Sequence, residues 1–365
     1  MKKKPHVFYG LLLLIASITF EGKTATKFFK ITNLVVPNPG DRAAVELAIS
    51  EFETNVNANL PTIDSSDLTR DTVNSNIISN KGLGVDYTNS MKSFMVGWSQ
   101  GASANLGSGE NILSGARTIK GFGMTTQFNL GLNFEPLKKR KLVNLPTIWG
   151  IDLNKTKIYM GLMKGNTSQK VSGYTLGFDL FSLNLRLMTK IKKAENFKNF
   201  FFKWGGIDLS TGLETNKTIL SVSVPRNDTI PDASNTLETN FNGNVGFSVT
   251  SSSYSVPLDV SASACFFSFI DLFWGLGADL NFGHGEGVST SDSDVIIRTV
   301  AAPKNQIATA DAEFNLGTRG SPSFFNARWF TGAQINLWKM KVALQAQHSI
   351  IKGIWGFGAN FNFIF

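Results

Sequence analysis

The sequence predicts an all-β protein, a closed antiparallel up-and-down transmembrane β-barrel of roughly 12–14 strands with a short N-terminal α-helical segment. From about Ser90 onward, apolar and polar residues alternate with a period of two, which is typical of half-buried strands. Several of these runs reach roughly 11–15 residues, longer than soluble strands and long enough to cross a bilayer at a tilt. The first residues also have the pattern of an export signal, and the one cysteine, Cys265, excludes an internal disulfide.

Composition narrows the class of protein further. Of the 365 residues, 42% are hydrophobic and only 17% are charged, below the ~25% of a typical soluble domain. No run approaches the ~18 apolar residues of a membrane-spanning helix, so a helical membrane protein is not predicted. A soluble periplasmic or extracellular β-protein, whose strands alternate equally well, is the alternative.

The first 25 residues have the pattern of a secretory signal peptide. Lys2, Lys3 and Lys4 precede an apolar stretch from Gly10 to Phe20, which is too short to span a bilayer as a helix. Removal of residues 1–25 takes away four lysines and one glutamate, so the net charge falls from +8 to +5. This modest charge is not that of a nucleic-acid-binding protein, and no nucleic-acid partner is expected.

Residues 26–82 are predicted to be an N-terminal segment ahead of the barrel. Residues 26–36 form a candidate strand, and Asp41 can cap a helix over residues 41–58. The apolar stripe of this helix recurs at 4-3-4 spacing and consists of Val45, Ile49, Phe52 and Val56. Such a stripe must be buried, which makes the helix a candidate plug of the barrel or a periplasmic element. Residues 61–82 are polar and show little pattern.

Residues 83–365 are predicted to form the barrel. In the clearest strand Phe128, Leu130 and Leu132 share an apolar face, while Gln127, Asn129 and Asn133 share the polar one. Similar alternation predicts strands over residues 237–249, 270–282, 326–337 and 355–365, with less regular candidates at 91–104, 157–164, 173–191, 201–222, 254–267, 295–300, 308–317 and 341–349. Residues 284–307 would then contain the longest barrel loop, whereas 251–253 and 350–352 would be tight turns.

Two basic connections stand out among the candidate site residues. One contains Lys138, Lys139, Arg140 and Lys141, and the other contains Lys192 and Lys193. Two strands separate the connections, so we expect them on one rim, where they could bind lipid phosphates or attract anions. An ordinary solvated turn is the alternative. With three histidines and one cysteine there is little material for a catalytic or metal site, so we expect no enzyme and no cofactor.

The final stretch, IWGFGANFNFIF, carries a family resemblance. With Phe361, Phe363 and Phe365 at even offsets, it resembles the terminal-strand assembly signal of Gram-negative outer-membrane β-barrels. That resemblance implies an outer-membrane location, contact with outer-membrane lipid and recognition by the barrel-assembly machinery. A weaker resemblance, at Asn38-Pro39-Gly40, is to the long-chain fatty-acid transporters, whose barrels follow an N-terminal hatch with an Asn-Pro-Ala motif.

Together these patterns predict a porin-like barrel for passive passage or uptake of small solutes, hydrophobic ones included. The alternative is a surface-exposed structural or adhesin-like barrel with a closed lumen. The small number of long loops favours the porin-like barrel, because an adhesin would present large charged loops.

Overall fold

A computed structural model describes residues 26–59, 65–105, 121–141, 144, 146–148, 151–171, 174–192, 202–231, 236–267, 269–301 and 303–365. The predicted leader, residues 1–25, lies outside these ranges. The helices are η1 (Pro39–Asp41), α2 (Arg42–Asn59), α3 (Ser65–Asn80), α5 (Phe134–Lys139) and η2 (Leu153–Lys155). The strands are β1 (Thr26–Val35), β2 (Phe94–Asn105), β3 (Gly121–Asn133), β4 (Thr147–Ile148), β5 (Ile151–Asp152), β6 (Thr156–Val171), β7 (Tyr174–Lys192), β8 (Phe202–Pro231), β9 (Leu237–Phe266), β10 (Ile270–Thr299), β11 (Gln306–Gly320), β12 (Phe325–Leu337), β13 (Met340–Ser349) and β14 (Ile354–Ile364).

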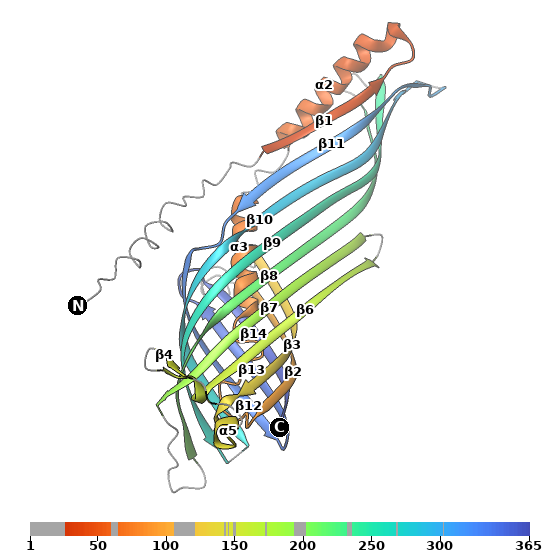
Figure 1. Cartoon of the computed structure of the whole chain (residues 1–365). Coiled ribbons are helices and arrows are strands. Elements are labelled where there is room, and N and C mark those ends of the chain that lie inside the picture. The colour runs from red at the N-terminus through yellow and green to blue at the C-terminus, as the bar shows by residue number, and fades with distance from the viewer. Residues whose placement is uncertain are drawn as a thin grey trace, which may run out of the picture.

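The main sheet has twelve strands, and ten of them pair in a ring. The order around the ring is β2, β3, β6, β7, β8, β9, β10, β12, β13 and β14, and β14 pairs again with β2. Every pairing in the ring is antiparallel (Figure 1). The other two strands, β1 and β11, lie outside it, so the ring is smaller than the 12–14 strands predicted although the whole sheet has twelve.

The ring has an apolar outside and a largely polar inside, apart from a buried apolar cluster around Tyr87, Phe273 and Phe330. On β3, Phe128 and Leu130 are exposed, whereas Gln127, Asn129 and Asn133 are buried, as the alternation predicts. The same arrangement holds on β14, where Phe357, Phe361 and Phe363 point outward. This is the inverse of a soluble barrel and is the distribution required of a wall that faces lipid. Among the described residues, no helix is long and apolar enough to span a membrane.

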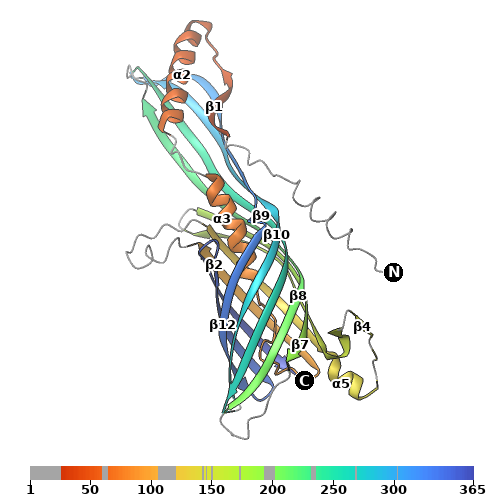
Figure 2. The ribbon, with the colours of Figure 1, turned by 90° about the vertical axis from the view of Figure 1, so that its left-hand side faces the viewer.

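Strands β8, β9 and β10 continue far beyond the ring and form a sheet extension. The lower part of β10 pairs with β12 up to Leu280, and from Gly285 onward the same strand pairs with β11 instead. Strand β1 adds to the free side of β11. At about 3.3 Å per residue, the segment of β10 from Gly285 to Thr299 is roughly 45 Å long. Figures 1 and 2 show the extension rising from the end of the ring opposite the C-terminus.

The extension corrects the predicted loop and turn at residues 284–307 and 251–253. Both stretches lie inside 30-residue strands or the β10–β11 hairpin. Glycines and serines suggested turns there, but they serve close packing. A Cβ at Gly285, for example, would lie 2.5 Å from Val73 Cγ2 and 2.8 Å from Thr69 Cγ2 on α3. Gly285 is therefore explained by the nearby helix and not by a reversal of the chain.

Helix α2 packs on the sheet extension. Val45 and Ala48 are buried against Ile31 of β1, Val295 and Ile297 of β10, Ala308, Ala310 and Ala312 of β11, and Leu237 of β9, with Ile49 and Phe52 alongside. Of the predicted stripe, Val45 is thus buried and Ile49 and Phe52 are partly buried, outside the ring. The candidate plug helix α2 packs in the apolar cluster of the extension, and the helix that contacts the strands of the ring is α3.

Candidate functional site

The interior of the ring is occupied by α3 and the residues that follow it. We call residues 65–87 the luminal segment. Every residue from Asp71 to Tyr87 is buried. Helix α3 contacts β2, β3 and β14 on one side and β8, β9, β10 and β11 on the other. The chain enters from the extension end, passes through the ring and begins β2 at the C-terminal end (Figure 2).

The luminal segment is held by polar contacts on several sides. Ser79 Oγ lies 2.8 Å from Thr125 Oγ1 of β3, and Asn80 Nδ2 donates to Asn184 Oδ1 of β7 at 2.7 Å. Gln347 of β13 donates to the carbonyl of Ile78 at 2.7 Å. Because buried polar groups need partners, a helix in a polar lumen must itself be polar.

Glycines on β2 and β3 allow α3 to approach the wall. A Cβ at Gly123 would lie 2.5 Å from the backbone nitrogen of Asn76, and one at Gly121 or Gly101 would also meet helix backbone. Backbone cannot move aside as a flexible side chain can, so these positions exclude larger residues. Two features of the sequence could have indicated that a helix lies inside the ring. These are the glycines on the inward face of β3 and the uncharged, mostly polar composition of residues 72–80.

Six charged side chains form a closed circuit around the end of α3, which we call the charge circuit. Cations and anions alternate, so that each contacts two of the opposite sign. The order is Lys81, Glu214, Arg186, Asp259, Arg328, Asp279 and back to Lys81. The five wall residues come from five consecutive strands of the ring, β7, β8, β9, β10 and β12. Three positive and three negative charges leave the circuit neutral.

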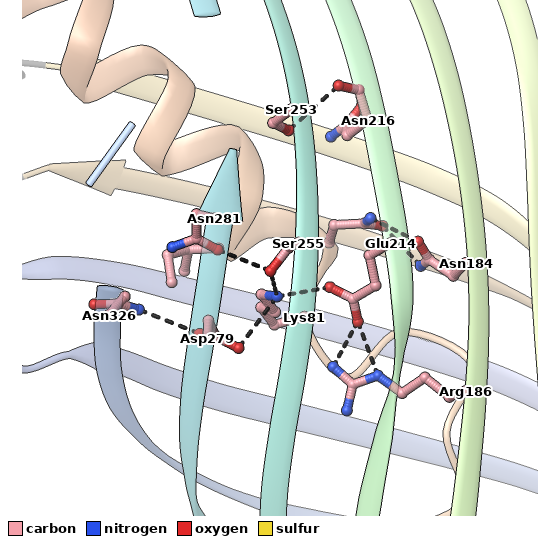
Figure 3. A network of polar contacts seen from close by, with 12 residues as sticks. Lys81, Asn184, Arg186, Glu214, Asn216, Ser253, Ser255, Asp279, Asn281 and Asn326 are labelled. Atoms are coloured by element: carbon pink, nitrogen blue, oxygen red, sulfur yellow. Dashed lines mark hydrogen bonds and ion pairs between the residues drawn. The ribbon is translucent and has the colours of Figure 1, made fainter. Parts of the chain in front are cut away.

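Lys81 joins the luminal segment to the wall. Its Nζ lies 2.8 Å from Glu214 Oε2 and 3.2 Å from Asp279 Oδ1, and it donates to Ser255 Oγ at 2.5 Å (Figure 3). The two carboxylates, from β8 and β10, form ion pairs with the ammonium group, and Ser255 of β9 accepts its hydrogen bond. The Lys81 side chain is 0% exposed. A buried ammonium is tolerated only with this degree of compensation.

On the other half of the charge circuit, arginines pair with Asp259, and a tyrosine of the luminal segment also contacts this carboxylate. Arg328 Nη2 lies 2.5 Å from Asp259 Oδ1, and the hydroxyl of Tyr87 donates to Asp259 Oδ2 at 3.1 Å. The Tyr87 ring lies against Phe273 and Phe330, with centroids 5.4 and 4.8 Å away. Both Lys81 and Tyr87 therefore fix the luminal segment, one at each end of residues 81–87.

The predicted basic residues lie at the C-terminal mouth of the ring. Lys138 and Lys139 belong to α5, Arg140 and Lys141 follow it, and all four are exposed. Lys192 is the exposed last residue of β7, and Lys193 lies outside the described residues. Lys138 and Lys155 approach Asp152 at 3.7 and 3.5 Å. The amide of Asn154 donates to Asp152 and holds the pKa of that carboxyl below its usual range, with these lysines adding to the effect.

The other predicted residues occupy different places. Val45, Ile49 and Phe52 pack in the sheet extension, and the side chain of Val56 lies outside the described part of the chain. Phe361, Phe363 and Phe365 are exposed on and just after β14. Asn38 caps η1 ahead of α2 through a bond from the Gly40 nitrogen, so the hatch-like triplet lies on the extension. In the described part of the chain, no group of three or more His, Cys, Asp or Glu side chains is placed to hold a metal ion.

Sequence reasoning missed the charge circuit entirely. Its six members lie between residues 81 and 328, each in a separate strand or turn, so no local motif joins them. Single charges on otherwise uncharged polar faces, such as Arg186 and Asp259, were the available signal. Which charges face each other depends on strand register, and register was not known from the sequence.

Among solved structures, the chain is similar to the translocator domain of the autotransporter NalP from Neisseria meningitidis, with 8% identity and a TM-score of 0.28 over 76% of this chain and 90% of that one. It is also similar to CarO of Acinetobacter baumannii, with 12% identity and a TM-score of 0.24 over 60% and 96% of the two chains. Similarity to Ail of Yersinia pestis gives 10% identity and a TM-score of 0.20 over 74% and 97%. No curated protein matches the chain.

One protein-family model matches the sequence over residues 39–365. The match begins at η1 and runs to the last residue, so it includes α2, the luminal segment, the ring and nearly all of the sheet extension. The chain therefore belongs to the Lsa36-like family.

Proposed function

We propose that the chain is an outer-membrane β-barrel whose closed wall anchors, and whose filled lumen stabilises, a sheet extension presented on the cell surface. This is a structural or interaction role without catalysis. The observation that carries it is the burial of every residue from Asp71 to Tyr87 inside the ring. A lumen filled by a segment fixed at Lys81 and Tyr87 favours a closed barrel over free passage of solutes.

The outer face of the ring supports insertion in a bilayer. On β9 and β10, exposed Leu258, Val260, Leu276 and Leu280 form part of an apolar belt. A polar row ends the belt, because Lys217 pairs with Ser252 and Ser252 pairs with His284 across β8, β9 and β10. Beyond that row the three strands continue as the extension, which supports a position of the extension outside the hydrocarbon layer.

The C-terminus sets the orientation that we propose. In outer-membrane barrels the terminal aromatic strand ends at the periplasmic side, and β14 here ends at Ile364, directly before Phe365. The tight turn at Trp338 and Lys339 lies at that same end, as short periplasmic turns do. The extension rises from the opposite end and would therefore face the outside of the cell (Figure 1).

Cysteine labelling on intact cells tests the orientation. In a Cys265→Ser background, we expect Ala301→Cys in the exposed β10–β11 turn to react with a membrane-impermeant maleimide, and Lys339→Cys to react only after permeabilisation. Both proteins should migrate faster on gels before boiling than after, which shows that they are folded. Labelling of Lys339→Cys alone on intact cells would reverse the orientation and overturn surface presentation.

Planar-bilayer conductance separates this proposal from the passage of small solutes. We expect the purified wild-type protein to be almost non-conducting, because the luminal segment fills the ring. Stable, open channels in the wild type at low voltage would show that solutes pass the luminal segment. The porin-like function, which the alternation and short loops favour, would then replace the anchoring role.

A further inference from the structure

A cavity of about 570 Å³ opens at the C-terminal mouth of the ring, at the end opposite the sheet extension. Its walls come from α5, from the chain between Tyr87 and β2, and from the adjoining ends of β3, β6, β7 and β8. Five lysines line it, namely Lys92, Lys139, Lys155, Lys157 and Lys190. We call it the lysine cavity. Its volume is in the range of small-molecule sites in proteins.

The lining of the lysine cavity carries an excess of positive charge. Only two acidic residues, Glu135 and Asp208, are present among its lining residues, against five lysines. Glu135 pairs with Lys139 at 3.1 Å on the exposed surface of α5. Asp208 accepts a hydrogen bond from the Asn89 amide. The lining residues carry a surplus of three positive charges, which Asp152, the partner of Lys155 at 3.5 Å, lowers to two, whereas the charge circuit deeper in the ring is neutral.

Lys157 is the most informative of the five lysines. Its side chain is buried although it points to the cavity from β6, and its Nζ donates to Asn89 Oδ1 at 2.6 Å. An ammonium has three donors, and Asn89, which also donates to Asp208, accepts one of them, so the carboxylates of Asp208 and Asp86 balance the charge of Lys157 only from a distance. Lys190 likewise donates to a neutral acceptor, the Gly205 carbonyl, at 3.2 Å. The ammonium of Lys92 makes no ion pair with any described residue.

The apolar part of the wall strengthens the attraction for an anion. Met91, Met188, Pro136 and Ile191 line the cavity beside the lysines. Apolar walls lower the local dielectric constant, so the field of the ammonium groups is screened less than on an open surface. An occupant with an anionic group and a short apolar or neutral body would complement both parts of the wall.

We propose that the lysine cavity is a binding site for a phosphate group carried by a small ester or by a phospholipid headgroup. Lysines bind phosphate as compact point charges, and several of them can approach its oxygens from different directions. Ile191, on the outward face of β7, is 62% exposed, so the cavity lies beside the lipid-facing wall and a headgroup could reach it. This site is at the other end of the ring from the extension and does not depend on what the extension presents.

Binding to the folded full-length protein tests the site. The probes are inorganic phosphate, glycerol 3-phosphate and detergent-solubilised phosphatidylglycerol, with phosphatidylcholine as the zwitterionic comparison. Calorimetry at low salt measures the binding of inorganic phosphate and glycerol 3-phosphate. Native mass spectrometry measures the binding of the two lipids. In Lys92→Gln/Lys190→Gln we expect affinity for the bound probe to fall about tenfold or more, because two charge-assisted contacts are lost. Lys139→Gln, on the exposed face of α5, should give a smaller fall without affecting folding.

The matched control is Lys164→Gln/Lys217→Gln, which removes two exposed lysines outside the cavity and the same net charge. Its affinity should stay within about twofold of the wild type, because long-range effects of exposed charges are screened. Binding of glycerol 3-phosphate supports a soluble ester as the ligand, and selective retention of phosphatidylglycerol supports a lipid. Equal loss in both double variants, or wild-type protein that binds none of the probes at millimolar concentration, would overturn the site.

Discussion

Replacement of Lys81 by methionine tests whether the charge circuit holds the luminal segment in the ring. Methionine is of similar length, so the variant removes the charge with little change in volume. It leaves Glu214 with Arg186 alone and Asp279 with Arg328 alone, and the buried circuit acquires a net charge of −1. The protein should become less stable and the luminal segment less firmly held.

The expected magnitude follows from the geometry. At an effective dielectric constant of about 20, contacts of 2.8 and 3.2 Å are each worth about 5–6 kcal/mol before desolvation. Desolvation of the ammonium opposes this by several kcal/mol, and removal of one partner from a buried network typically costs about 3–5 kcal/mol. We expect a loss in that range, seen as a lower temperature for the transition between the folded and boiled gel positions. Intermittent conductance in planar bilayers should accompany it.

A second substitution shows whether Lys81→Met destabilises the protein through the unbalanced charge or through the loss of the Lys81 contacts. Lys81→Met with Asp279→Asn returns the circuit to neutrality, because two arginines then face two carboxylates. We expect this double variant to recover part of the lost stability, about 1–2 kcal/mol. Lys217→Met, on the outer surface, is the control and should resemble the wild type. If Lys81→Met melts and conducts like Lys217→Met, the circuit does not hold the luminal segment.

Three further predictions concern the wall, the extension and the lipid face. Gly123→Val should displace α3, because its side chain would meet the backbone of Asn76; we expect about 1–3 kcal/mol of destabilisation and new conductance, with an unchanged closed state as the contrary result. Val45→Asp buries a charge in the core of the extension and should make that region protease-sensitive while the ring keeps its heat-modifiable shift. Leu130→Arg should lower the stability of the folded barrel in lipid by about 2–4 kcal/mol. Asn129→Lys should also destabilise the protein, because Asn129 is buried beside the luminal segment. A mild effect of Asn129→Lys would indicate an open lumen.

The wall of the ring could be predicted because every second residue of a lipid-facing strand must be apolar. Alternation on β3 and β14 identified which residues face outward, and the structure agrees at Phe128, Leu130 and Phe361. The apolar stripe of α2 predicted a buried helix for the same reason. In both cases an apolar surface needs an apolar partner, and its period can be read from neighbouring residues.

The luminal segment could not be predicted in that way. Its helix lies against a polar wall, so Thr72, Asn76 and Ser79 take the positions where an ordinary amphipathic helix has apolar residues. Hydrophobic periodicity, the strongest signal for a helix, is therefore absent. The extension was missed for a related reason, since the turn-like residues Ser251, Ser253 and Gly285 are buried strand positions, and Gly285 lies against α3.

The polar helix is a consequence of the width of the ring. Side chains alone fill a barrel of about eight strands, whereas a ten-stranded ring encloses more space. A helix is about 10 Å across, and the inward glycines of β2 and β3 make room for one beside the remaining side chains. Because a barrel in lipid directs its polar face inward, the occupant must satisfy polar groups from every strand that it touches. The neutral charge circuit does this at Lys81, where one ammonium contacts acceptors on β8, β9 and β10 together. Loss of α3 would leave those carboxylates and amides to water, so occupation of the lumen and stability of the wall should change together when the circuit is broken.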